Sequence, residues 1–542
     1  MRTPSLLLRA LNDGLDTLGG PAPSPSGPSY DVYADSAAAP GSGTASSPYA
    51  SLADAGGALS DDDALALAAG SSWREGLDLA ALSDVSVVSY GSGPLPVVDG
   101  SDVVAPGAFA ASAHGDAAGV VYETAWTRGP GPLRGQDTPL LWEDDARLVQ
   151  VASVALCAAT PGTYHAATPQ GATSTLYVHP FGSTNPTSDG KTYEVTTRIA
   201  AVDALDAPGV TAEGLHLRRG WGHYGPFSGG TGATLRRSVV EGGGIHHVVQ
   251  KGGLLEDVVV TDMTRTAGGG IPATFYTPGD GAGVAPPVAR RVVVVGEPGA
   301  LANAPLGMGG LYAHTDDPAG WPSIGGYRGS AVSHAATAFD GLSAGPFPQV
   351  GNYAYACGIA HSLAGPDASV RYGVARECRA RPNGEGGVLN VGGVSGATGT
   401  RVIEHEVVYT STLATTAYST GVQCPAMRGS ITLRHCVLVV DSGTHELSGA
   451  VLYLSGMSGA DRLTVHMEYC VVVQQRANVA LIEADHVTYT GHHNVFARLD
   501  YEDPIAYPYF KLDGVVRQGL TAWFAASGET DSVALIPSQY AV

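Results

Sequence analysis

The sequence predicts an all-β fold: a single-stranded right-handed parallel β-helix with a small inserted antiparallel β module and a short N-terminal helical arm. Three observations predict it. A polar pair, followed by a small or thiol residue and then valine, recurs roughly every 20 to 34 residues, as stacked coils require. The 74 Gly and 35 Pro supply tight turns. Apolar residues make up 44% of the chain, enough for a large core.

The charge balance limits the partners. The chain has 29 basic and 50 acidic residues, a formal net charge of −21, and its only lysines are Lys191, Lys251 and Lys511. A surface of this kind repels phosphate backbones, so nucleic-acid binding is not expected. The same balance argues less strongly against a polyuronate as the main ligand, because a local basic groove is compatible with it.

Residues 1–29 are expected to form an anchoring arm. Leucines in residues 4–17 have helical spacing and predict a short amphipathic helix, followed by a Pro-rich linker over 21–28. An isolated helix of this length is marginal, so docking onto a partner protein or a sister subunit is expected. No signal peptide is expected, because polar residues interrupt the apolar stretch, and the chain has no apolar run that predicts membrane insertion.

Residues 30–110 are expected to form the entrance and cap of the β-helix, with a small helix through residues 52–55. The succession Y-V-…-D-S…G-T…P-Y-x-S-L-x-x-A, then W-R-E-x-L, then V-S-V-x-S-Y-G…P-V-V-D-G carries a resemblance. It resembles the pectate-lyase-like β-helix superfamily, which includes bacteriophage tailspikes and extracellular polysaccharide lyases and hydrolases. The resemblance covers most of the chain at the level of fold, and its motifs mark the scaffold.

The resemblance implies a tailspike or fibre-like receptor-binding protein at the virion surface, on a tail or head appendage. Such a protein would bind host-surface polysaccharide along the flank of its β-helix. It would attach to other virion structural proteins through residues 1–28. A polysaccharide-degrading enzyme, either a lyase or a glycoside hydrolase, is the alternative on the same fold. A structural surface component with no ligand is the third reading.

Residues 111–198 interrupt the repeat. Trp126, Trp142, Tyr164 and the stretch over 175–195 predict a small antiparallel β module, similar to the insert near the start of many of these β-helices. A structural collar is the favoured interpretation, and a lectin-like role is the alternative.

Residues 199–500 are expected to form the coils. In each coil, the polar pair is expected to lie in a turn beside a strand that faces the core. The expected members begin at Ala212, Leu235, Leu255, Ala289, Ala375, Ile403, Leu433, Met467 and Gly491. Residues 501–542 are expected to close the stack with a Trp and a G-x-x-x-S turn. No large C-terminal trimerisation domain is expected, which would depart from many tailspikes, and a homotrimer stays an open expectation.

The longest irregular stretches between the expected coils lie at 218–232, 262–287, 296–335 and 339–365. Stretches of this kind usually build the ligand groove. The densest group of aromatic, His and Asp residues follows residue 311. Its candidate catalytic residues are His314, Asp316, Asp317 and Asp340, and its candidate glycan-binding residues are Tyr312, Trp321, Tyr327 and Arg328.

Two chemistries fit this group. Paired carboxylates serve as acid and base in glycosidic cleavage, and aromatic rings stack on sugar faces. A His and a Tyr beside an Arg instead move a proton, as a lyase requires. Asp316 and Asp317 are adjacent and would point to opposite faces of an extended strand. A turn whose Asp side chains cap backbone amides is the structural alternative, and a calcium site is a weaker one.

A second group holds Trp221, His223 and Tyr224 between glycines, which suggests an exposed platform for sugar stacking. Packing against a neighbouring subunit or loop is the alternative. The pair His246-His247 has no third ligand at a suitable spacing, so it predicts a turn, and no metal or other cofactor is expected. The six cysteines form no CxxC pair and have apolar neighbours, which predicts buried free thiols.

Overall fold

The structure is a computed structural model, and it places its strands in two compact units. The N-terminal unit contains residues 1–275 and 295–297, and the C-terminal unit contains residues 276–294 and 298–542. The structure describes residues 29–114, 119–129, 139–168, 173–221, 225–244, 246–263, 273–277, 286–296, 309–315, 326–333, 335, 337–342, 347–363, 367–378, 388–391, 399–410, 420–440, 450–456, 462–474, 481–498, 508–513 and 515–535. The predicted arm over 1–28 lies outside these residues.

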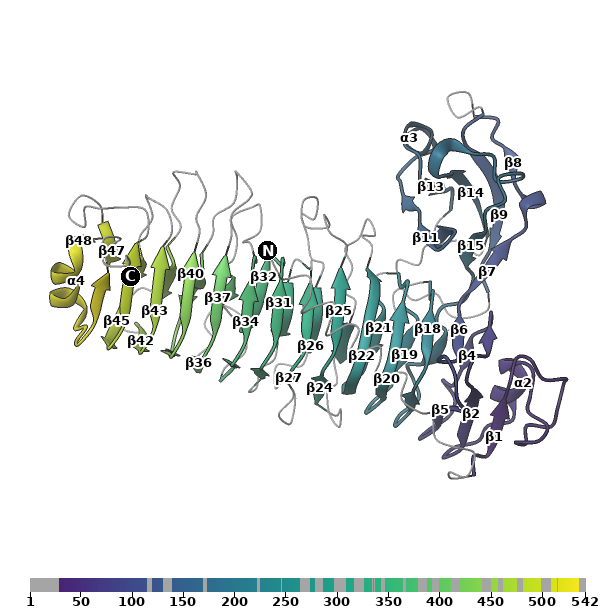
Figure 1. Ribbon diagram of the computed structural model, residues 1–542, viewed down its shortest axis with the longest axis horizontal. Helices are drawn as coiled ribbons and strands as arrows, with labels where there is room; N and C mark the ends of the chain where they lie inside the picture. Colours follow the sequence, from purple (N-terminus) through teal and green to yellow (C-terminus); the bar gives the residue numbers. More distant parts are fainter. Residues whose placement is uncertain are drawn as a thin grey trace. The chain divides into compact units, whose positions relative to one another are not determined.

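Each unit is a stack of parallel strands of the β-helix type, which confirms the predicted all-β class (Figure 1). A full coil contains a first strand, a left-handed turn, a second strand and, after a longer connection, a third strand. Strands of the same kind pair in parallel from one coil to the next. Side chains alternate between the core and the outside, as in any β-strand, and the inward positions hold mainly Val, Leu, Ile and Ala.

In the N-terminal unit the strands fall into three rows. The first row is β1 (Val32–Ala34), β2 (Ala64–Ala68), β5 (Ser86–Tyr90) and β17 (Thr211–Glu213), and the second is β3 (Ser72–Trp73), β6 (Val97–Asp99) and β18 (His216–Arg218). The long strands β20 (Thr234–Glu241) and β22 (Gly253–Met263) run through both rows. The third row is β4 (Leu77–Asp78), β16 (Val202–Ala204), β19 (Phe227–Gly229), β21 (Val248–Gln250) and β23 (Ala273–Thr277).

The predicted entrance helix is present as α2 (Leu52–Gly57). Its N-cap is Ser51, whose side chain accepts a hydrogen bond from the amide of Asp54, as Ser commonly does at this position. Leu52 and Ala55 are fully buried, and they anchor the helix to the first coils. Among the described residues, no helix is both long enough and apolar enough to cross a membrane.

The predicted inserted module is also present, as two small and mainly antiparallel sheets. One sheet holds β7 (Ser101–Val104), β10 (Leu141–Glu143), β11 (Ala146–Arg147) and β15 (Tyr193–Thr196). The other holds β8 (Ala110–Ala111), β9 (Tyr122–Thr127), β12 (Val149–Gln150), β13 (Thr163–Ala166) and β14 (Thr173–His179), with the turn η1 (Pro106–Ala108), the helix α3 (Val154–Ala159) and the turn η3 (Phe181–Ser183) beside them. Trp126, Tyr164 and Tyr193 are buried in its core. The module therefore starts at β7, before the expected boundary at 111.

In the C-terminal unit the three rows are longer. The first is β24 (Pro287–Arg290), β27 (Gly326–Arg328), β30 (Pro348–Val350), β33 (Ser369–Arg371), β36 (Thr400–Glu404), β39 (Ser430–Arg434), β42 (Leu463–Glu468) and β45 (Val487–His492). The second is β25 (Val293–Gly296), β28 (Ala331–Ser333), β31 (Tyr353–Tyr355), β34 (Val374–Arg376), β37 (Val407–Thr410), β40 (Val437–Val440), β43 (Val471–Gln474), β46 (Val495–Arg498) and β49 (Val533–Leu535). The third is β26 (Gly309–Thr315), β29 (Thr337–Leu342), β32 (Ile359–Leu363), β35 (Leu389–Asn390), β38 (Val422–Met427), β41 (Leu452–Gly456), β44 (Ile482–Asp485) and β47 (Pro508–Leu512), with β48 (Val515–Gln518) antiparallel at its edge.

One left-handed residue joins the first and second strands of each coil. In the C-terminal unit these residues have φ between 51° and 65°. We call them the turn column: Arg291, Gly329, Gly351, Tyr372, His405, His435, Tyr469 and His493. The amide of each donates to the carbonyl just before the turn of the next coil, as His405 N does to Arg434 O at 2.9 Å. The predicted polar pair is therefore the last residue of the first strand and the turn-column residue.

The expected coil register is wrong at one point. Val370, and not Ala375, aligns with Ile403, while Ala375 lies in the second row and aligns with Val408. The confusion has a structural cause, because Glu377 is also left-handed, with φ of 53°, and is followed by the buried Cys378. Both turns of that coil thus produce the same short sequence pattern.

The stretches 296–335 and 339–365, expected to be irregular, contain strands β26 to β32. Their inward positions include Gln349, Asn352 and Gly310, which interrupt the apolar pattern of the sequence.

At the C-terminal end, helix α4 (Gly519–Ser527) follows the last hairpin in place of the expected turn alone. Its Trp523 is fully buried and stacks on Phe510, with 4.6 Å between ring centroids. All six cysteines are buried and free, as predicted.

Candidate functional site

The predicted site residues are distributed unevenly. Asp316, Asp317, Trp321, His223 and Tyr224 lie outside the described residues. Tyr312 and His314 belong to strand β26, for which the structure describes the backbone at these two positions. Arg328 is exposed at the end of β27. Asp340 is partly buried on β29 and aligns with Tyr312 on β26.

Two predicted glycan-binding residues, Trp221 and Tyr327, are buried, and for Trp221 this corrects the expectation of an exposed platform. Trp221 is 1% exposed, packs with Ile199 and Ala200, and meets Trp126 edge to face at 5.8 Å between ring centroids. Tyr327 is fully buried, and its hydroxyl donates to the backbone carbonyl of Asp340 at 2.7 Å. Both rings have partners inside the protein, so neither has a face open to a sugar.

Asp340 instead belongs to a row of outward-facing polar side chains. In the third row of strands, each such residue aligns with its counterpart on the next coil. We call this row the outer polar stripe: Asp340, Ser362, Asn390, Gln423, Tyr453, Glu483 and Lys511. Six strand steps of about 4.8 Å make it roughly 29 Å long.

The stripe faces outward because its neighbours face inward. Leu389 and Val391 flank Asn390, Val422 and Cys424 flank Gln423, and each of these four flanking residues is fully buried. All stripe members except Ser362 are partly exposed. Hydroxyl and carboxamide groups both donate and accept hydrogen bonds, carboxylates accept them and the Lys511 ammonium donates them, and sugar hydroxyls need such partners. The arrangement is suited to an extended polar ligand.

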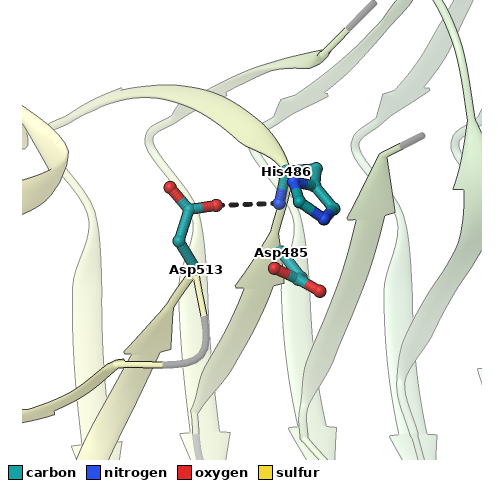
Figure 2. A group of neighbouring side chains, drawn as sticks. All are labelled: Asp485, His486 and Asp513. Carbon is teal, nitrogen blue, oxygen red and sulfur yellow. Dashed lines mark hydrogen bonds between the residues drawn. The ribbon is translucent and has the colours of Figure 1, made fainter. Parts of the chain in front are cut away.

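At the C-terminal end of the stripe, Figure 2 shows Asp485, His486 and Asp513 side by side. Among the described residues, these three alone form a group whose metal-binding atoms lie within 4.8 Å of one another. Asp513 is already engaged: it accepts the amide of His486 at 2.8 Å and forms an ion pair with Arg462. The hydrogen bond from Arg462 lowers the pKa of Asp513. Arg462 thus supplies the positive charge that a metal ion would bring.

The turn column carries a second surface feature. Tyr372, His405, His435, Tyr469 and His493 stack face to face, with centroid distances of 4.8, 4.9, 5.1 and 5.0 Å. A left-handed conformation costs a side chain such as His roughly 1 kcal/mol. Each ring stack contributes about 0.5–1.5 kcal/mol, which offsets that cost.

An alternating row of charges runs beside this stack, one residue earlier in each coil. Arg371 pairs with Glu404 at 3.3 Å, Arg434 pairs with both Glu404 and Glu468, and His492 lies 3.2 Å from Glu468. Opposite charges on adjacent parallel strands stabilise the register. Because these groups neutralise one another, this part of the surface offers little net charge to a ligand.

Inside the same unit, a chain of buried polar groups crosses the core. His361 is fully buried; its Nδ1 lies 2.6 Å from Oε1 of Gln349, and its Nε2 lies 3.4 Å from Oε1 of Glu406. Glu406 is also fully buried and accepts the amide of Gly373 at 2.9 Å. These groups have no access to a glycan, so their role is structural.

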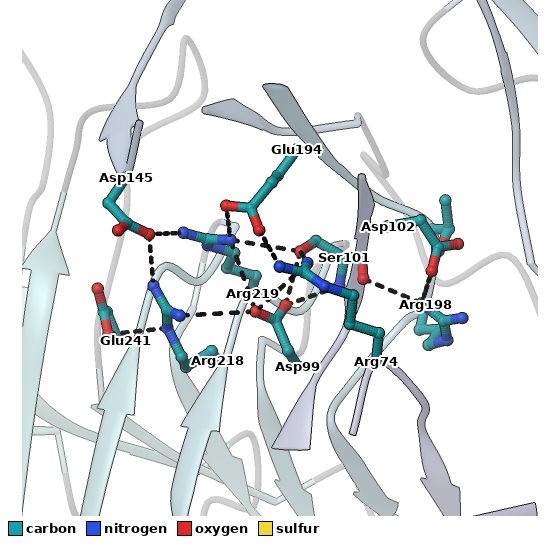
Figure 3. Close-up of polar contacts among 11 residues, drawn as sticks. Arg74, Asp99, Ser101, Asp102, Asp145, Glu194, Arg198, Arg218, Arg219 and Glu241 are labelled. Atoms are coloured by element: carbon teal, nitrogen blue, oxygen red, sulfur yellow. Dashed lines mark hydrogen bonds and ion pairs between the residues drawn. The ribbon is translucent and has the colours of Figure 1, made fainter. Parts of the chain in front are cut away.

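In the N-terminal unit, a buried ion network joins the inserted module to the coils (Figure 3). Arg219, 1% exposed, forms ion pairs with Glu194 of the module and with Asp145, and lies 3.5 Å from Asp99. Arg74 also pairs with Glu194. The charged groups of the network pair with one another, so the network holds the inserted module to the coils.

Of the residues in the outer polar stripe, only Asp340 was predicted from the sequence. The signal was nevertheless present, because an apolar–polar–apolar triplet such as Leu452-Tyr453-Leu454 or Ile482-Glu483-Ala484 recurs once per coil. Such triplets become a stripe only when the coils are in register, and the register was not evident through residues 296–365. No protein-family model matches the chain, and no curated protein matches it.

Proposed function

We propose that this chain is a surface protein that binds a polysaccharide along the outer polar stripe. Its stacked parallel coils would provide a rigid binding surface. The single observation that carries the proposal is the alignment of Asp340 through Lys511 on successive strands. A regular row of hydrogen-bonding groups suits a ligand that also repeats. The scaffold of paired strands holds each group in place before binding, which lowers the entropic cost.

The test is binding to a panel of bacterial capsular and lipopolysaccharide glycans, measured by biolayer interferometry. The variant Asn390→Ala/Gln423→Ala/Tyr453→Ala should bind at least tenfold more weakly, because three central contacts are lost. The matched control is Thr432→Ala/Thr464→Ala, which removes two outward, partly exposed hydroxyls from the first row of the same coils. Equal affinity of the triple variant and the control would rule out the stripe.

A second candidate function, hydrolysis of the bound glycan, is favoured by one observation. Carboxylate oxygens of Asp485 and Asp513 lie within 4.8 Å of each other at the end of the stripe. Retaining glycosidases place their two carboxyl groups about 5 Å apart. The lowered pKa of Asp513 keeps it ionised, as a nucleophile requires, and Asp485 would then be the acid.

New reducing ends after incubation with a bound glycan would indicate hydrolysis, and Asp513→Asn should abolish them while binding persists. If binding occurs with neither reducing ends nor unsaturated sugars, the protein recognises glycan without cleaving it. The tailspike-like attachment through residues 1–28 remains part of the proposal. Deletion of 1–28 should remove the protein from particles and leave glycan binding unchanged.

A further inference from the structure

The ring stack of the turn column ends at Tyr372, which stacks on a column neighbour on one face only. Tyr372 stacks on His405, with 7° between the ring planes. The next two members of the column, Gly351 and Gly329, have no side chain, and Tyr372 is 60% exposed. No column neighbour therefore covers the second face of Tyr372.

Among the described residues, little fills the space beside that face over two coils. A Cβ built on Gly351 comes no closer than 4.0 Å to the backbone N of Gly329, and one built on Gly329 lies 3.7 Å from Cγ of Arg291. Both glycines keep the hydrogen-bond register of the column, since Gly351 N donates to Arg371 O at 2.8 Å. Two strand steps make this slot roughly 10 Å long.

A basic side chain borders the slot. Arg328 aligns with Val350, and Val350 aligns with Arg371, so the two arginines flank the slot in the adjoining row. Arg371 pairs with Glu404, whereas Arg328 is exposed and forms no ion pair within the described part of the chain. The alternating charge row thus stops where the ring stack stops, and it leaves a local positive charge on a chain whose net charge is −21.

We propose that this slot, formed by Tyr372, Gly351, Gly329 and Arg328, binds a carboxylated sugar ring of an acidic polysaccharide. The apolar C–H face of the sugar would stack on Tyr372, and its carboxylate would pair with the guanidinium of Arg328. The ligand class rests on the proposed function, but the residues are separate from the outer polar stripe. A nucleic acid fits less well, because repeated phosphates need more cations than this border supplies.

The probes are a galacturonic acid oligomer and its methyl ester, titrated by calorimetry into the full-length protein. Wild type should prefer the free acid. Tyr372→Ala should weaken binding of the acid by about tenfold, the upper range for one aromatic contact, while Tyr372→Phe retains it. Arg328→Gln should abolish the preference for the acid over the ester.

Two further variants separate a binding role from a structural one. Gly351→Tyr extends the stack into the slot. Its left-handed backbone cost of roughly 1 kcal/mol is offset by the new stack on Tyr372, so it should block binding with little change in the melting temperature. Tyr469→Ala removes a ring that His435 and His493 cover on both faces, and it should leave affinity unchanged. Unchanged affinity in Tyr372→Ala, or equal loss in Tyr469→Ala, would overturn the proposal.

Binding of the short oligomer to the slot should not depend on the residues of the outer polar stripe. The Asn390→Ala/Gln423→Ala/Tyr453→Ala variant should bind the short oligomer as wild type does. If that variant loses the oligomer and Tyr372→Ala retains it, the slot proposal fails while the stripe proposal stands. Tighter binding of a single-stranded oligonucleotide than of the acid oligomer would assign the slot to nucleic acid and overturn the sugar assignment.

Discussion

The buried ion network of the N-terminal unit and the exposed charge row of the C-terminal unit use the same residue types under opposite conditions. Arg219, Glu194 and Asp99 have side chains 1%, 6% and 3% exposed, respectively. Arg371 and Arg434 have side chains 46% and 44% exposed. Burial makes these three charges of the network depend on their partners, whereas water screens the charges of the row. The network can therefore fasten a module, and the row mainly sets strand register.

The largest effect is expected at Arg219. The Arg219→Met variant should lose about 3–5 kcal/mol, because Glu194 and Asp99 remain buried with less compensation. The measurement is the thermal unfolding of the full chain, followed by the fluorescence of the tryptophans near the network. A loss no greater than that of an exposed arginine variant would show that the network is not fully desolvated.

Glu241, at the edge of the network, makes the stability of this unit depend on pH. Burial alone would raise its pKa, but a hydrogen bond from His216 and the charge of Arg218 outweigh burial and lower it from 4.5 to about 2. A lowered folded-state pKa stabilises the fold above pH 4.5, and this contribution disappears as pH falls toward 2. Glu241→Gln should therefore reduce stability by about 3 kcal/mol near neutral pH and by almost nothing near pH 2.

Acid titration of the melting temperature, with wild type and Glu241→Gln side by side, provides the check. The two curves should converge as pH drops from about 4.5 to about 2. Parallel curves through this window would contradict the assignment of the stabilisation to ionised Glu241.

A smaller effect is expected in the ring stack. His435→Ala loses two stacks, worth about 0.5–1.5 kcal/mol each, and still pays the left-handed backbone cost. His435→Gly loses the same stacks but relieves that cost, so it should be the more stable variant by roughly 1 kcal/mol. The unfolding midpoints of the two variants give the comparison, and an alanine variant as stable as the glycine variant would mean that the backbone is unstrained.

The smallest effect is expected in the exposed row. Arg434→Met should change the melting temperature only slightly, although Arg434 contacts both Glu404 and Glu468. Any change should shrink as salt is added, because exposed pairs are screened. A large change that persists in high salt would place this row with the buried network.

The coils from residue 403 to 494 were predictable because their inward positions hold Ile403, Leu433 and Met467, and the last two are followed by the buried thiols Cys436 and Cys470. The coils around Gln349 and Asn352 were not. There the inward side chains are polar and are satisfied by contacts from other coils, such as Asn352 Oδ1 accepting Ser330 N at 3.0 Å. Such a contact depends on residues 22 positions apart, so no local pattern reveals it.

The candidate site was predictable only in part for the same reason. Asp340 was found through its local group, but its alignment with Ser362 and Asn390 depends on coil lengths. Trp221 was misjudged because flanking glycines suggested exposure. Here Gly220 is required by packing instead: a Cβ would lie 2.5 Å from the backbone of Gly225.

The buried thiols can report the order in which the coils of this protein open. Cys436 and Cys470 occupy the same inward position on neighbouring coils, and Cys357, Cys378 and Cys424 lie elsewhere in the same unit. A thiol reagent modifies each of them only after its own coil loosens. Because coils in a solenoid contact mainly their neighbours, the labelling rates read in sequence would show whether the stack unravels from one end or all at once.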